Sequence, residues 1–193
     1  MKFAQVSAAQ GNNMQWVALL RGINVGGRNK VPMKELRHSL EKEGFSRVKS
    51  YIASGNIILN SSSHTGRELT GTIETILQRD FSVDTRVLIL RGSKFQQIAE
   101  AIPGDWENDK EQKSDVLFLF PEDDSRDILS RVPPREGIDT AHYVPGALLW
   151  NVLRRNQGKT GLQKITSTDI YKSLTIRNVN TVRKISSMLN QDS

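Results

Sequence analysis

A glycine-rich segment near the N-terminus carries the residues best suited to binding chemistry. Gly22, Gly26 and Gly27 lie between Arg21 and Lys30. Glycines let the backbone approach a ligand closely, and backbone N–H groups ahead of a helix bind anions. The residues after the last glycine do not complete a P-loop, and the dinucleotide pattern G-x-G-x-x-G is absent. The segment therefore predicts an anion site without ATP or NAD chemistry, and we expect no cofactor.

The same segment also has an interpretation that needs no ligand. Gly26 and Gly27 can simply allow a left-handed turn of the backbone. Asn24, which stands between the first two glycines, can tie the loop to its surroundings by hydrogen bonds from its side chain to backbone groups. Both interpretations stay open from the sequence alone.

A second candidate cluster is the bend at Ser54 and Asn56. In a split βαβ sheet the first and third strands are neighbours, so this bend should lie beside residues 21–24. With the cations of Arg28 and Lys30, one edge of the sheet would hold hydroxyl, amide and cationic groups that suit a phosphate or a carboxylate. As an alternative, Asn56 only bonds the loop backbone.

A third candidate cluster lies near the C-terminus. Asn178 is well placed to cap a helix, which would leave the N–H groups of the next residues facing outward. Arg177 and Asn180 flank this cap. The cluster is therefore a candidate anion site in outline. The alternative is an ordinary cap beside an arginine in a salt bridge.

Catalytic residues are scarce in this chain. There is no cysteine, and His38, His64 and His142 are isolated, without the spacing of metal ligands. We expect no metal site, and we identify no catalytic triad in the sequence. Whether the protein is an enzyme stays open.

The first half of the chain reads as β-α-β-β-α-β. Helical spacing of apolar residues follows Pro32 and ends at Gly44, and a second helical stripe runs from Leu69 to Leu77. This order predicts a ferredoxin-like fold for residues 14–91. The expected strands are residues 15–21, 48–53, 56–59 and 83–90, and a helical stripe follows at 95–102.

The second half begins in the same way. Residues 103–113 read as a polar connector, and residues 1–13 as a disordered leader. We therefore predict an α+β fold with two subdomains, 14–102 and 114–193, the second being β-α-β-β followed by C-terminal helices. The expected elements are strands at 116–120, 140–144 and 147–153 and helices at 124–132, within 160–173 and after residue 178.

Charge is distributed unevenly along the chain. The net charge is +6, but residues 14–60 hold 8 lysines and arginines against 3 glutamates, and residues 151–193 hold 8 against 2 aspartates. Residues 100–130 instead hold 3 basic against 10 acidic residues. This asymmetry can steer an anionic ligand, or it can reflect solvated surfaces of mixed sign. No apolar run is long enough for a membrane span, so we expect a cytoplasmic protein without a membrane partner.

Long sequence motifs point to a family. Four segments closely resemble the bacterial domain-of-unknown-function 1697 family: residues 18–27 (ALLRGINVGG), 30–33 (KVPM), 51–56 (YIASGN) and 175–182 (TIRNVNTV). The resemblance implies a cytoplasmic bacterial protein of two α+β subdomains, the first ferredoxin-like, and it brings no activity with it. Val179 stands where a tryptophan is often expected.

Three functions follow as hypotheses. The leading one is binding of a phosphate-bearing small molecule or nucleotide at the glycine-rich edge. The second is a hydrolase of phosphate esters or acyl phosphates, by analogy with acylphosphatases, in which Asn56 would position water. The third is a nucleic-acid-binding module that contacts only the phosphate backbone, because the third strand lacks the aromatic platform of RNA-recognition domains. The oligomeric state cannot be inferred.

Overall fold

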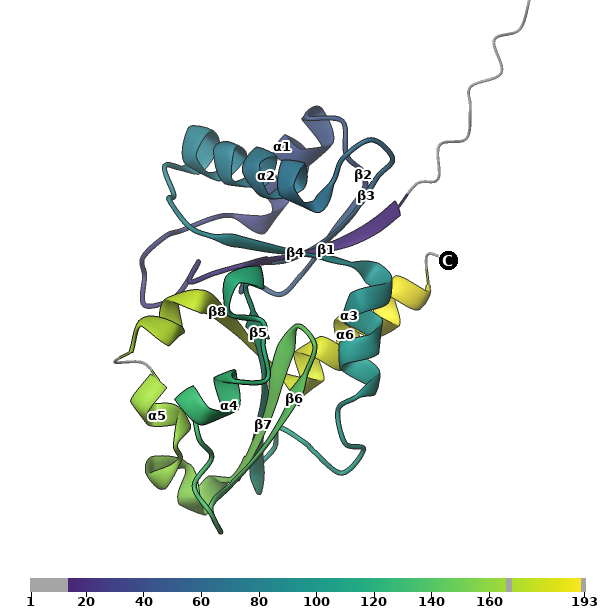
Figure 1. Cartoon of the computed structure of the whole chain (residues 1–193). Coiled ribbons are helices and arrows are strands. Elements are labelled where there is room, and N and C mark those ends of the chain that lie inside the picture. The colour runs from purple at the N-terminus through teal and green to yellow at the C-terminus, as the bar shows by residue number, and fades with distance from the viewer. Residues whose placement is uncertain (1–13, 166–167, 192–193) are drawn as a thin grey trace, which may run out of the picture.

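The computed structural model of the chain describes residues 14–165 and 168–191 and consists of two stacked antiparallel sheets (Figure 1). The leader predicted at residues 1–13 lies outside the described residues. Each sheet has four strands, and helices lie above, between and beside the sheets. The predicted α+β class is confirmed. No helix in the described ranges is long and apolar enough to span a membrane.

The first sheet has the strand order of a ferredoxin-like fold, β2-β3-β1-β4. Its central strand β1 (Met14–Leu20) pairs with β3 (Asn56–Ser61) on one side and with β4 (Val87–Arg91) on the other. The edge strand β2 (Ser46–Tyr51) pairs with β3. The predicted β-α-β-β-α-β order is therefore confirmed for this half.

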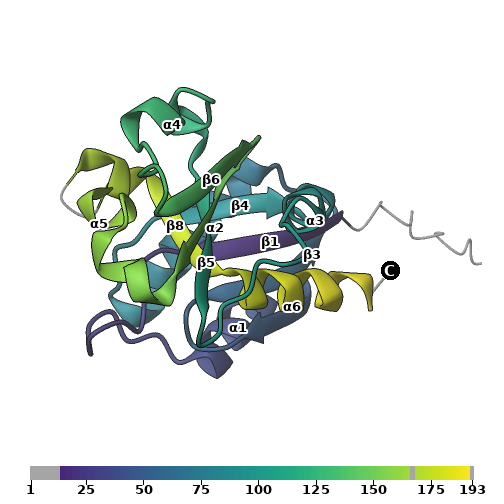
Figure 2. The same cartoon turned by 90° about the horizontal axis from the view of Figure 1, so that it is seen from below.

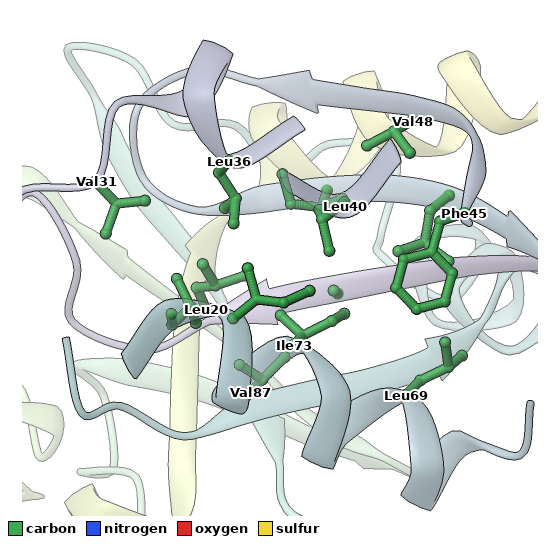
Figure 3. Packing of buried hydrophobic residues seen from close by; sticks show 14 of the residues in the cluster. Leu20, Val31, Leu36, Leu40, Phe45, Val48, Leu69, Ile73 and Val87 are labelled. Carbon is green, nitrogen blue, oxygen red and sulfur yellow. The ribbon is translucent and has the colours of Figure 1, made fainter. Parts of the chain in front are cut away.

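Two long helices cover the outer face of the first sheet. They are α1 (Met33–Lys42) and α2 (Gly66–Phe81), and α2 begins with a capping box in which Thr65 and Glu68 bond each other's backbone. Leucines and isoleucines from these helices pack on alternate residues of the strands beneath (Figure 3). The contacts are apolar throughout, as the 3.6-residue spacing predicts.

The second sheet repeats the same relative order, β6-β7-β5-β8. The prediction stopped at three strands here, and the structure adds a fourth. This strand, β8, is only five residues long, lies at the edge of the sheet and has an arginine in its sequence, so it lacks an apolar signal. The strands are β5 (Gln112–Leu119), β6 (Asp139–Val144), β7 (Ala147–Leu153) and β8 (Leu174–Asn178).

Short helical segments cover the outer face of the second sheet. The helix predicted at 124–132 shrinks to one turn, and the one predicted within 160–173 divides into two short pieces, because neither stretch has sustained apolar spacing. These segments are η1 (Pro121–Asp123), α4 (Ile128–Arg131), η2 (Arg154–Lys159), α5 (Leu162–Ile165) and η3 (Asp169–Ser173).

Two helices pack between the sheets and join them through one shared core (Figures 1 and 2). They are α3 (Gly92–Glu100) and α6 (Val179–Asn190), each of which follows the last strand of its half. Val17 and Leu19 of β1 face this core, whereas the alternate residues Trp16, Ala18 and Leu20 face α1 and α2. Both faces of the first sheet are therefore covered, unlike the open face with which RNA-recognition domains bind bases.

Candidate functional site

The glycine-rich segment forms a small hairpin of its own. The backbone N–H of Asn24 donates to Asn29 O at 3.0 Å, and the N–H of Arg28 donates to Val25 O at 3.1 Å. Gly26 and Gly27, at the tip, have φ of 59° and 75°, the left-handed pair that a tight hairpin turn needs. A Cβ at either position would meet nothing within 4 Å. These two glycines therefore serve the turn, as the interpretation without a ligand predicts.

Asn24 fastens this hairpin to the rest of the first sheet. Its Nδ2 donates to Val31 O at 3.0 Å and to Ala53 O at 2.7 Å, and its Oδ1 accepts from the N–H of Val31 at 2.8 Å. The side chain thus links the two ends of the loop with the bend before β3. Its role here is positional.

The bend at Ser54 to Asn56 lies beside the end of β1, as predicted. Leu19 pairs with Asn56, and the N–H of Leu20 donates to Gly55 O at 2.8 Å. Gly55 has a φ of 79°, and a Cβ there would lie 2.7 Å from Leu20 Cβ. Only glycine fits this close approach, and the approach brings the bend against the first residues of the loop.

Arg177 crosses from the second sheet into the first. Its Nη2 donates to Leu20 O at 2.8 Å and to Gly55 O at 3.2 Å, and its Nε donates to Asn56 Oδ1. Nη1 stays in the second sheet and donates to Thr175 Oγ1 and to Ile176 O. All five N–H groups of the guanidinium are therefore used, which joins the two sheets.

No carboxylate compensates this buried cation. Arg177 is 7% exposed, and every acceptor that the structure gives it is neutral. Burial alone lowers the pKa of the guanidinium to about 10. The charge therefore has hydrogen-bond partners but no counter-ion in the described part of the chain.

A cavity of about 420 Å³ opens in front of this arginine, and we call it the arginine cavity. Arg21, Arg28 and Arg177 line it together with Ser54 and Tyr171. No aspartate or glutamate is among its lining residues in the described ranges. The charged side chains that line the cavity are therefore all positive.

The arginines that line this cavity differ in freedom. Arg21 donates from Nε to Leu174 O and from Nη2 to Tyr171 O, and its guanidinium lies 5.1 Å from the centre of the Tyr171 ring. The exposed side chain of Arg28 has no hydrogen bond or ion pair with any residue described in the structure. Arg28 can therefore turn toward a ligand without breaking an internal contact.

The candidate residues from the sequence fall into three groups. Arg21, Gly22, Ser54 and Arg177 line the arginine cavity. Lys30 is exposed and is not among the residues that line the cavity, and the remaining candidates of the first half build its scaffold. The residues in the scaffold are Asn24, Gly26, Gly27 and Asn56.

Two of the C-terminal candidates, Asn178 and Asn180, do not line the arginine cavity. Asn178 caps α6, as predicted, because its Oδ1 accepts from the N–H of Thr181 at 2.8 Å. Asn180 donates from Nδ2 to Asn108 O at 3.2 Å, which ties α6 to the segment before β5. Of this cluster only Arg177 reaches the site, and sequence reasoning missed Tyr171 altogether.

Asn56 is not free to position water. It is 1% exposed, its Nδ2 donates to Tyr51 O and Ser54 Oγ at 3.0 Å each, and its Oδ1 accepts from Arg177. Both ends of the amide are therefore engaged inside the protein. The residue on which the acylphosphatase analogy depended serves here as a structural link.

The model of a family described as "Protein of unknown function (DUF1697)" matches residues 14–150. The chain belongs to this family. The DUF1697 match includes the glycine-rich loop and the bend at Ser54, and it ends before the motif at Thr175 to Val182. The family resemblance of the sequence motifs is thus confirmed.

A solved structure extends the likeness to the C-terminal part. The chain is similar to a conserved bacterial protein from Streptococcus pneumoniae, with 30% identity and a TM-score of 0.78. The similarity covers 91% of this chain and 98% of that one. No match was found among curated proteins. The family and the fold of the chain are therefore shown.

Proposed function

We propose that this protein is a cytoplasmic binding protein for a phosphate-bearing small molecule, nucleotides included, and that the arginine cavity holds the phosphate. One observation carries the proposal. Three arginines line the cavity, no acidic residue in the described ranges does, and the buried arginine among them lacks a counter-ion.

A phosphate would complement this cavity electrostatically. Burying a guanidinium without an opposite charge is unfavourable, and an anion close to it recovers part of that free energy. The charge of Arg177 would attract the phosphate electrostatically, without a direct hydrogen bond, because its own N–H groups already have acceptors in the protein. Arg28, whose guanidinium is unengaged, would supply the direct bidentate contact.

Hydroxyl groups at the cavity add neutral donors. Ser54 Oγ accepts a hydrogen bond from Asn56 Nδ2, and Thr175 Oγ1 accepts one from Arg177 Nη1. Each hydroxyl proton therefore remains able to donate to a phosphate oxygen. Tyr171 is 38% exposed, and the exposed part of its ring offers an apolar surface to the rest of the ligand.

Isothermal titration calorimetry tests the proposal at constant ionic strength. The probes are inorganic phosphate, pyrophosphate and a panel of nucleoside phosphates. Arg28→Ala should weaken binding about ten- to a hundredfold, because a charge-assisted hydrogen bond contributes roughly 1.5–3 kcal/mol. Arg135→Ala is the matched control. This arginine is exposed in the loop before β6, and its guanidinium has no hydrogen bond or ion pair in the described structure.

The control decides between a site and a general charge effect. We expect Arg135→Ala to bind as the wild type does. Equal losses in the two variants would show that only net charge matters. Absence of binding by the wild type to every probe at millimolar concentration would reject the proposal.

A further inference from the structure

A second cavity, of about 470 Å³, lies on the outer face of the second sheet, and we call it the Asp115 cavity. Lys113 and Asp115 of β5 line it, and Arg154, Leu162 and Ile165 come from the segment that follows β7. Its volume is within the range of small-molecule sites. It shares Tyr171 with the arginine cavity but contains different charged groups.

Asp115 is an unusual residue for this position. It lies on a central strand, paired with Trp150 of β7 and Asn178 of β8, and it shares a face with the core residue Leu117. It is only 7% exposed. The one polar contact of its side chain in the described structure is Lys113, whose Nζ is 3.6 Å from Oδ2. Burial raises the pKa of this carboxyl group against the opposing influence of Lys113 and Arg154.

Arg154 is held rigidly at the same cavity. Its Nε donates to Asp109 O at 2.9 Å, Nη1 to Gln157 Oε1 at 3.2 Å and Nη2 to Asn108 Oδ1 at 2.9 Å. These three acceptors are neutral, and no carboxylate pairs with the guanidinium in the described structure. Two of its five N–H groups have no partner there, so the side chain is pre-organised to bind an anion.

From this arrangement we infer that the Asp115 cavity binds a free α-amino acid. A carboxylate that accepts and two cations that donate face one cavity, and this pattern complements a ligand with an ammonium group next to a carboxylate. The ammonium group would bind Asp115, and the ligand carboxylate would bind Lys113 and Arg154. The side chain of the ligand would lie against Leu162 and Ile165.

The weak internal ion pair supports a ligand role over a structural one. At 3.6 Å, the Lys113 to Asp115 contact is longer than a charge-assisted hydrogen bond, and Lys113 is partly exposed. A buried carboxylate so poorly compensated costs stability in the free protein. An ammonium group in the cavity would give Asp115 a shorter contact and would release Lys113 to the ligand carboxylate. Sites that trade stability for binding commonly have this property.

Calorimetric titration of the full chain with the standard amino acids tests the inference. Three forms of the best-binding amino acid separate the two charges: the free acid, its N-acetyl derivative and its carboxamide. We expect the free acid to bind at least tenfold more tightly than either derivative, because each derivative lacks one charged hydrogen bond. A wild-type protein that binds none of the amino acids at millimolar concentration, or all three forms equally, overturns the inference.

Variants assign the binding to this cavity. Asp115→Asn should weaken binding of the free acid at least tenfold, while its thermal unfolding stays cooperative and its melting temperature does not fall. Asp84→Asn is the matched control, because Asp84 is an exposed aspartate before β4 that does not line the Asp115 cavity. This variant should bind the free acid as the wild type does. Equal affinity of the Asp115→Asn variant and the wild type would refute the site. Arg28→Ala should leave amino-acid binding unchanged, so this inference and the proposed phosphate site can fail separately.

Discussion

The two sheets have one strand order but two kinds of covering. In the first, α1 and α2 of 10 and 16 residues close the outer face with apolar side chains. In the second, α4 and α5 have four residues each, and 3₁₀ turns complete the cover. A short helix buries little apolar surface, so room for polar groups and cavities remains. The outer face of the first sheet is thus covered by two long amphipathic helices, whereas the Asp115 cavity opens on the outer face of the second sheet.

The buried charges follow the same division. Among the described residues, the two charged side chains that are buried are Asp115 and Arg177, and both belong to the second sheet. The buried polar residues of the first sheet are uncharged, for example Asn56 and Asn60. Buried charge is costly and is therefore expected where it does something that an apolar residue cannot.

The largest expected loss of stability comes from replacing Arg177, whose hydrogen bonds join the two sheets. Arg177→Met should lower the free energy of unfolding by about 3 kcal/mol, because Leu20 O, Gly55 O and Asn56 Oδ1 would lose buried donors. Urea denaturation measures the change. Arg21→Met, which removes two bonds at a half-buried position, should cost only about 1 kcal/mol. Similar values for the two variants would show that Arg177 does not hold the sheets together.

A pair of glycines in the first half tests its close packing. Gly55→Ala should destabilise the protein by about 2 kcal/mol, because a Cβ would contact Leu20 at 2.7 Å and φ is positive. Gly71→Ala in α2 should instead stabilise it by roughly 0.5–1 kcal/mol, since nothing lies within 4 Å of the added atom and alanine favours a helix. The same sign in both thermal melts would contradict the packing described here.

The smallest effect is a pH dependence that should be confined to the second half. Burial raises the pKa of Asp115 in the folded protein above its usual value of 3.8. At a pH between the pKa of the unfolded state and that of the folded state, the folded state therefore binds more protons than the unfolded state. The free energy of unfolding of the wild type should therefore fall, relative to Asp115→Asn, as pH rises from about 4. Urea denaturation of both proteins between pH 3 and pH 8 measures this. A difference that does not change with pH would contradict the assigned burial.

The sequence predicted the first half better than the second for a physical reason. Leu36 and Leu40, or Leu69 to Leu77, repeat at helical spacing, and such long periodic segments carry a strong signal. Residues 174–178 carry only a weak one, because β8 has five residues, pairs along one edge only, and buries the polar side chains of Thr175 and Arg177. Its existence depends on the partner strand β5, which is far away in sequence.

The candidate site was predicted in part. The neighbourhood of the glycine-rich loop and the Ser54 bend followed from strand order, and Arg177 joined them because β8 lies next to β5. Tyr171 had no motif to mark it. Asp115 did leave a signal, since the two-residue period of a strand places it on the same face as Leu117, where a charge is unexpected.

Crystals soaked in tungstate, a heavy analogue of phosphate, test most directly whether the arginine cavity binds anions. The account predicts an anomalous difference peak between Arg28, Arg21 and Ser54, and its loss in crystals of Arg28→Ala. A peak elsewhere on the protein with the arginine cavity empty would contradict it.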